Sequence, residues 1–145
     1  MRAVVQRVSS ARVDVGAETV GEIGLGLCVL LGVTHSDAPA QAIKMANKLY
    51  GVRLFDDADG VMNLSLAEVD AAVLVISQFT LYGDVTKGRR PTWIAAARPA
   101  AAEPLIDQVV AELRALGAGV ETGRFRADMV VSIVNEGPAT LIIET

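Results

Sequence analysis

The sequence holds only one cysteine and one histidine in 145 residues, which limits the chemistry open to a single chain. Cys28 has no partner for an intrachain disulfide, and we interpret it as a small buried apolar residue. A zinc site of the common Cys/His kind needs more such ligands, and the acidic turn at residues 56–60 lacks the spacing and closing glutamate of a calcium loop. His35 lies in a predicted strand-to-helix connection, and we interpret it as structural. Catalytic pairs that need an imidazole base are then excluded, so we expect a reaction without metal or cofactor.

A long uninterrupted apolar run is missing from the start of the chain. Arg2, Arg7 and Arg12 break up its apolar residues, so neither a signal peptide nor a membrane span fits, and we expect a cytoplasmic protein. An excess of positive charge is missing as well. The net charge is −4, which disfavours broad binding of nucleic acid. The local exception is segment 87–90 with three cations, which is either an RNA contact or a solvated basic loop.

The residues that are present indicate a mixed α/β protein with a single domain over residues 1–145. Apolar residues make up 52% of the chain, and neither a linker nor a repeat divides it. Strands are predicted where apolar residues alternate with polar ones or form short runs, and helices are predicted where apolar residues recur at helical spacing. The predicted strands are residues 2–15, 18–23, 25–32, 71–77, 129–134 and 139–144. The predicted helices run from an N-cap at Ser36 or Asp37 to about Tyr50, and over about residues 100–116.

Two polar segments follow predicted strands. The loop after a strand is a common place for a ligand, and backbone N–H groups released there can stabilise an oxyanion. Hydroxyl groups without a base are weak nucleophiles, so the first segment either orients a substrate or merely closes its strand. The second segment predicts a tight turn whose Gly137-Pro138 bond is a candidate for the cis form. The first segment is Ser77, Gln78, Phe79 and Thr80, and the second is residues 135–138.

Together these segments resemble the two signature motifs of D-aminoacyl-tRNA deacylases. The opening residues 1–8 and the stretch 127–129 share the likeness, which covers essentially the full chain. The resemblance implies a barrel-like sheet with two main helices outside, assembled as a symmetric homodimer with active sites at the subunit interface. The first motif is Ser77-Gln78-Phe79-Thr80-Leu81-Tyr82-Gly83-Asp84, followed by Lys87-Gly88-Arg89-Arg90-Pro91, and the second is Asn135-Glu136-Gly137-Pro138-Ala139-Thr140.

The resemblance also implies a mechanism. The first motif of one subunit lines a pocket for the terminal adenosine and its aminoacyl ester, and Gly137-Pro138 reaches in from the partner with a cis bond. Its carbonyls hold the amino group and exclude an L side chain, so the expected substrates are D-aminoacyl-tRNA and glycyl-tRNA, including glycyl-tRNA(Ala). The tRNA 2′-hydroxyl promotes attack, and N–H groups near Phe79 and Thr80 form the oxyanion site. The implied catalytic residues are Ser77, Gln78, Phe79 and Thr80; the implied substrate-binding residues are Gly137, Pro138, Asn135, Thr140, Arg89 and Arg90.

Three positions depart from the family pattern. Ala139 replaces the usual valine and could loosen the loop that enforces chirality. Thr92-Trp93 replaces serine and phenylalanine, and Trp93 either stacks on the terminal adenine or packs in the core. Arg126 stands where glycine is common. Two alternatives stay open: a noncatalytic dimeric module that binds an RNA end or a nucleotide, and a hydrolase that uses Thr80 as a nucleophile.

Overall fold

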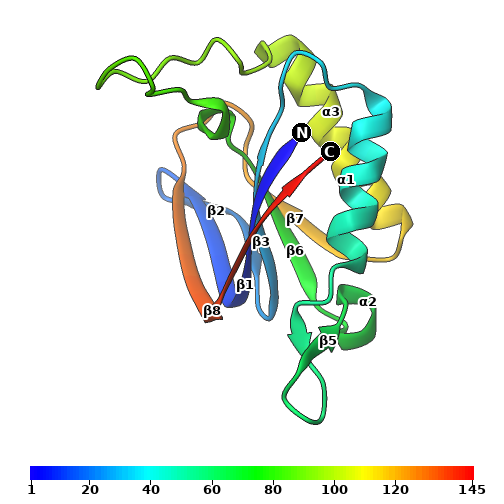
Figure 1. Cartoon of the computed structure of the whole chain (residues 1–145). Helices are drawn as coiled ribbons and strands as arrows, with labels where there is room; N and C mark the ends of the chain where they lie inside the picture. Colours follow the sequence, from blue (N-terminus) through cyan, green and yellow to red (C-terminus); the bar gives the residue numbers. More distant parts are fainter.

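The computed structural model describes residues 1–145 and shows one six-stranded sheet, a small two-stranded sheet and helices on one side (Figure 1). The mixed α/β class predicted from the sequence is confirmed. In chain order the elements are β1 (Arg2–Val15), β2 (Glu18–Ile23), β3 (Gly26–Gly32), α1 (Pro39–Gly51), β4 (Phe55–Asp56), β5 (Met62–Leu64), α2 (Leu66–Val69), β6 (Ala72–Ser77), η1 (Phe79–Tyr82), α3 (Pro99–Ala115), β7 (Gly119–Thr122) and β8 (Val130–Glu144).

The main sheet is built around β1. Along one edge, its first half pairs antiparallel with β3 and its second half pairs with β2, which confirms the predicted hairpin. Along the other edge it pairs with β8. On the far side of β3, the strands β6 and β7 continue the sheet in parallel. The carboxyl ends of β3 and β6 therefore lie at the same edge of the sheet.

The sheet curls until β2 lies close to β7, at the other end of the strand order. A Cβ atom added to Gly21 of β2 would lie 2.5 Å from the carbonyl oxygen of Thr122 in β7, so only glycine permits this approach. The curl encloses a cluster of small and branched apolar side chains that includes Cys28, Leu74 and Ile76. The barrel-like core and the buried position of Cys28 are thus both confirmed.

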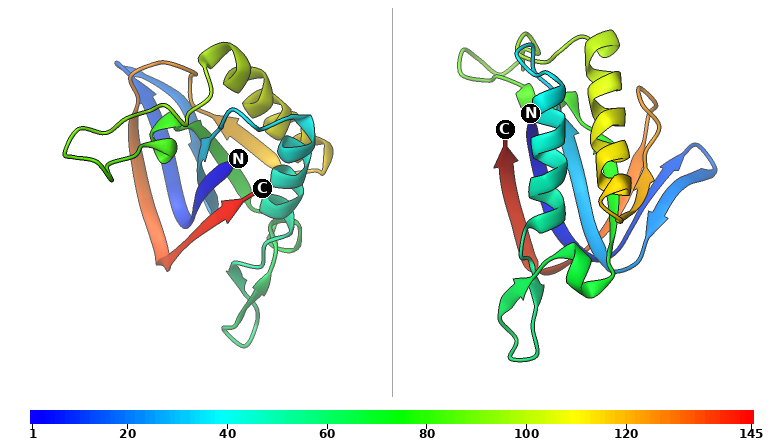
Figure 2. Two further views of the ribbon diagram at one scale, coloured as in Figure 1. Left: turned by 45° about the horizontal axis from the view of Figure 1, so that its top comes forward. Right: turned by 90° about the vertical axis from the view of Figure 1, so that its right-hand side faces the viewer.

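The helices α1 and α3 cover the outer face of the sheet side by side (Figure 2). Their apolar residues recur at helical spacing, so each helix has one face that packs against the larger core cluster. This arrangement confirms the prediction of two main helices on the outside. None of the helices combines the length and the apolar character that a membrane-spanning helix needs. The buried positions are Ala42, Met45, Ala46 and Leu49 in α1, and Ala102, Ile106, Val109, Val110 and Leu113 in α3.

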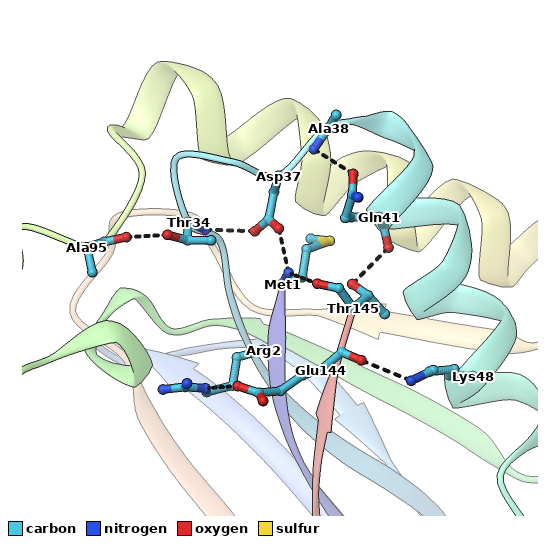
Figure 3. A network of polar contacts seen from close by, with 10 residues as sticks. All are labelled: Met1, Arg2, Thr34, Asp37, Ala38, Gln41, Lys48, Ala95, Glu144 and Thr145. Carbon is cyan, nitrogen blue, oxygen red and sulfur yellow. Dashed lines mark hydrogen bonds and ion pairs between the residues drawn. The ribbon is translucent and has the colours of Figure 1, made fainter.

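The start of α1 differs from the prediction, because its N-cap is Ala38 rather than Ser36 or Asp37. Pro39 occupies the first turn, where its missing N–H costs nothing. The carboxylate of Asp37 is used elsewhere: it accepts hydrogen bonds from the α-amino group of Met1 at 2.5 Å and from the N–H of Thr34 at 2.7 Å. Figure 3 shows how this network joins the start of β1 to the connection before α1.

The predicted tight turn between two final strands is wrong. A hairpin turn would pair its two strands with each other, whereas here both halves of β8 pair with β1, at Val8 with Asn135 and at Gln6 with Thr140. The residues between them bulge out, and β8 bends sharply (Figure 1). Gly-Pro is compatible with a turn and with a bulge, and only the pairing partner distinguishes them. The Gly137-Pro138 bond is cis.

Candidate active site

The first polar segment lies in the turn that follows β6. The last ladder hydrogen bond runs from the N–H of Gln78 to the carbonyl oxygen of Leu31 at 2.8 Å. The chain then enters the short 3₁₀-helix η1, and the N–H groups of Phe79 and Thr80 have no acceptor within the chain. This edge of the sheet therefore presents two free backbone donors.

A cavity of about 640 Å³ opens beside this turn, within the size range of small-ligand sites. Leu31 and Ile76 line it from β3 and β6, and Ala102 and Ile106 line it from α3. The loop before β8 contributes residues 125–129. Ser77, Gln78 and Phe79 also line the cavity, so the structure brings most of the first predicted segment to one mainly apolar pocket.

The hydroxyl groups near the pocket have no basic partner. The side-chain amide of Gln78 donates a hydrogen bond to Oγ1 of Thr80, which leaves the Thr80 proton free to donate to a ligand. The His35 ring donates through Nε2 to the carbonyl oxygen of Ile94 at 2.7 Å, in agreement with a structural role. No three His, Cys, Asp or Glu side chains gather anywhere in the chain as a metal-binding group would.

Two aromatic rings stand at the pocket. Phe79 is 57% exposed and meets Trp93 edge to face, with ring centroids 5.3 Å apart. The indole packs against the backbone of Gly83, where an added Cβ would lie 2.5 Å from a ring carbon. Trp93 is itself 42% exposed and lines the cavity, so the core-packing alternative for this residue is wrong. The pair offers apolar faces on which a planar base can stack.

Sequence reasoning missed the residue that holds η1 in place. The guanidinium of Arg2 donates to the carbonyl oxygen of Leu81 at 2.9 Å and lies 5.0 Å from the ring centroid of Tyr82. Its Nε also bonds to a carboxylate oxygen of Glu144 at 2.7 Å (Figure 3). Burial of the phenol raises the pKa of Tyr82 to about 12, and the negative charge of Asp37 adds to this effect. The second residue of the chain thus anchors the turn that carries Phe79 and Thr80.

The cations near the site fall into two groups. Arg89 and Arg90 lie on segment 84–92, which projects from the body of the molecule (Figure 1), and both are exposed without a hydrogen-bond partner. Two backbone hydrogen bonds of 2.9 Å between Asp84 and Thr92 close the base of this segment. The N–H of Thr86 lowers the pKa of the Asp84 carboxyl. The second group is Arg98 and Arg126, which line the pocket itself and were not predicted as site residues.

The second predicted segment does not meet the first within one chain. Ser77 pairs with Leu31, which pairs with Ala3, so the first segment lies near the start of β1. The bend in β8 lies beside Gln6 to Val8 instead, roughly 15 Å further along the strand at the usual rise per residue. The two motifs therefore occupy opposite ends of the sheet (Figure 1).

Side chains of β1 and β8 hold this bend in shape. Nδ2 of Asn135 donates to the carbonyl oxygens of Arg7 and Ala139, at 2.8 and 3.2 Å. Nε of the buried Arg7 donates to the carbonyl oxygen of Glu136 at 3.3 Å, and Nε2 of Gln6 donates to Oγ1 of Thr140 at 3.3 Å. Gly137 and Pro138, at the apex, are exposed. The apex of the bend is therefore exposed, and side-chain hydrogen bonds hold the main chain on both sides of it.

Comparison with known proteins places this fold in a class. A solved structure of a protein named c-Myc DNA Unwinding Element Binding Protein superposes with a TM-score of 0.94 at 36% identity, covering 100% of this chain and 99% of its own. A probable eukaryotic D-amino acid tRNA deacylase shares the fold with a TM-score of 0.84 at 18% identity, over 99% and 98% of the two chains. The class that these superpositions define is one of fold, a curled α/β sheet with helices on its outer face.

Within that class, the family model described as D-Tyr-tRNA(Tyr) deacylase matches residues 4–144. The D-aminoacyl-tRNA deacylase of Streptomyces coelicolor is 59% identical, with 99% of each chain covered. That of Symbiobacterium thermophilum is 57% identical over 100% of this chain and 96% of its own. The chain belongs to the D-Tyr-tRNA(Tyr) deacylase family, as its two motifs indicated.

Proposed function

We propose that the protein hydrolyses the ester of D-aminoacyl-tRNA to free tRNA and a D-amino acid. The observation that carries the proposal is the apolar pocket beside η1, because it holds the first family motif next to two unpaired backbone N–H groups. A nucleoside fits the apolar floor and the exposed aromatic faces of Phe79 and Trp93. The ester carbonyl would then lie by the free N–H groups of Phe79 and Thr80.

The hydrolysis we propose depends on the substrate for its activation. Thr80 Oγ1 is hydrogen-bonded only to the Gln78 amide, which cannot accept its proton as a base does. The ribose 2′-hydroxyl of the tRNA would instead promote the attack of water on the ester carbonyl. The N–H groups of Phe79 and Thr80 would hold the developing oxyanion, a contribution that commonly accelerates such reactions by two to three orders of magnitude.

The active unit we propose is a symmetric homodimer. The two family motifs lie at opposite ends of the sheet, so Gly137-Pro138 can reach a pocket only if that pocket belongs to a second copy. The outer edge of β8 has no pairing strand, and Val130, Val134 and Ile142 are more than half exposed along it. A long uncovered edge strand with apolar side chains is a natural surface for association.

The chirality filter we propose is the exposed main chain at the bend of β8. Carbonyl oxygens of Gly137-Pro138 would hold the amino group of the substrate and leave no room for an L side chain. Because such a filter does not grip the side chain, it should pass many D-amino acids and also glycine on tRNA(Ala). Asn135 supports the filter through its bonds to main-chain carbonyls rather than by direct contact.

The first experiment compares D-tyrosyl-tRNA, L-tyrosyl-tRNA and glycyl-tRNA(Ala) with the purified protein in the presence of a chelator. We expect fast loss of the D-tyrosyl and glycyl esters and a stable L ester.

Thr80→Ala should reduce kcat only mildly, and Thr80→Ser should match the wild type. Complete loss with Thr80→Ala would instead assign Thr80 as the nucleophile.

A subunit-mixing experiment tests the shared site. One variant carries Phe79→Ala with Trp93→Ala, which removes both aromatic faces of the pocket. The other carries Gly137→Val, where an added Cβ would lie 2.9 Å from the Ala139 nitrogen. After the two are unfolded and refolded together, mixed dimers would have one intact site and recover activity above that of either variant alone. Activity no higher than the average of the two parents would contradict a site built from both subunits.

The alternative function is a noncatalytic nucleic-acid-binding module. The observation that favours this candidate is the similarity to a solved structure at 36% identity whose name is that of a DNA-binding protein. The two functions are separated by the D-tyrosyl-tRNA assay, because a binding module would protect or ignore the ester. Binding of uncharged tRNA without turnover of any aminoacyl ester would support the module.

A further inference from the structure

The mouth of the pocket carries an arginine in an unfavourable backbone conformation. Arg126 has a φ of 62°, which lies in the left-handed region of backbone conformation. A residue with a side chain is destabilising in this region, whereas glycine adopts it without strain. The only other non-glycine residue with positive φ is Asp70, at the end of a short helix. Residues held in such conformations cluster at functional sites.

The side chain of Arg126 has no hydrogen bond or ion pair inside the chain that compensates for this conformation. It is exposed, and it takes part in none of the hydrogen bonds or ion pairs of the structure. Arg98, at the start of α3, lines the same pocket and is likewise exposed and unpaired. Asp128 also lines the pocket but forms an ion pair with neither arginine. Two exposed guanidinium groups without a hydrogen-bond or ion-pair partner therefore lie at the mouth of the same pocket.

We infer that Arg126, with Arg98, binds the phosphodiester on the 5′ side of the terminal nucleotide of the substrate. The inference rests on the proposed function, in which the terminal nucleoside enters the pocket and its ester meets η1. The phosphate is the next group along the nucleic acid and is too polar for the apolar floor, so it stays at the mouth. Guanidinium groups suit it because they can donate two parallel hydrogen bonds to a phosphate.

Cations at the pocket would let an acidic protein hold an anionic substrate. The chain has a net charge of −4, so long-range attraction to a nucleic acid is weak and local cations must supply the contact. Arg98 and Arg126 act at the last phosphate, next to the scissile ester. The cations of segment 84–92 lie farther out and suit phosphates deeper in the acceptor strand.

The test compares Arg126→Gly with the wild type on two substrates, D-tyrosyl-tRNA and the D-tyrosyl ester of plain adenosine, which has no phosphate. We expect the variant to raise KM for the tRNA about fivefold, the usual value of one exposed charge contact, and to leave the adenosine ester unaffected. The salt dependence of tRNA binding should lose about one unit of slope. The Tm should be unchanged or higher, because glycine relieves the strained backbone, so a folding defect cannot imitate the result.

A neighbouring arginine provides the matched control. Arg124 lies in the same loop but is ion-paired with Glu18 at 2.8 Å and does not line the pocket, so Arg124→Ala should leave KM for the tRNA unchanged. An equal rise for Arg124→Ala, or an equal effect of Arg126→Gly on both substrates, would overturn the inference, as would no effect on either substrate. If the wild type hydrolyses neither ester, the proposed function fails. Weaker binding of uncharged tRNA by Arg126→Gly than by Arg124→Ala would then still support the phosphate contact.

Discussion

Replacement of Arg2 by methionine tests whether β1 positions the catalytic turn. Methionine keeps a long unbranched chain but removes the guanidinium that bonds to Leu81 and faces Tyr82. A partly buried hydrogen bond from a charged donor contributes about 1.5 kcal/mol, and the cation–π contact adds roughly 0.5 kcal/mol. The Glu144 pair adds little, because both of its side chains are well exposed. Arg2→Met would therefore remove roughly 2 kcal/mol of the interaction free energy that holds this turn in position.

The expected consequence is a loss of catalytic rate rather than of affinity. The pocket that would bind the nucleoside is not touched by Arg2, whereas the N–H groups of Phe79 and Thr80 move with η1. A displacement of about 1 Å in a catalytic group can lower the rate on the order of a hundredfold. We expect Arg2→Met to reduce kcat for D-tyrosyl-tRNA by roughly ten- to a hundredfold with KM within about threefold of the wild type.

Steady-state kinetics and thermal unfolding on the same preparations provide the assay. Arg12→Met is the control, because Arg12 lies on the same strand, pairs with Asp14 at 3.0 Å and makes no contact with η1. Arg2→Lys should recover part of kcat, since an ammonium can still reach a carbonyl oxygen but cannot reproduce the planar fork. Full kcat in Arg2→Met, or an equal loss of kcat in Arg12→Met, would refute this role of Arg2.

Three further predictions concern the pocket and the core. Trp93→Ala should raise KM for D-tyrosyl-tRNA roughly tenfold, the value of one base stacked on an aromatic ring, and an unchanged KM would remove Trp93 from the binding surface. Gly21→Ala should destabilise the fold by about 1–3 kcal/mol in a urea titration, because its Cβ would press on β7; a neutral effect would contradict the tight closure of the barrel. Burial raises the pKa of the Cys28 thiol to about 11 from an ordinary 9.0. Between these values the unfolded chain loses a proton that the folded chain keeps, so stability should fall as pH rises through this window. The decline should be smaller in Cys28→Ala, and equal slopes would show that the thiol is not the cause.

Long elements with a clear apolar period were predictable from the sequence. The hairpin of β1 and β2, the buried β3 and the faces of α1 and α3 follow the expected spacing, because burial of one face imposes that spacing locally. The short elements β4, β5, α2, η1 and β7 were not predicted. They contain four residues at most, too few to show a period, and are held by contacts from distant parts of the chain.

The sequence by itself determined the family and the two motifs, since these depend on which residues stand at which spacing. It also limited the source of an imidazole base within one chain to a single residue, because His35 is the only histidine. Tertiary structure alone decided that the two motifs lie at opposite ends of the sheet, since strand register sets this separation. It likewise brought Arg2 to Leu81, 79 residues away in the chain, and left Arg126 unpaired at the pocket mouth. Such contacts depend on how the sheet curls, which no local pattern of residues records.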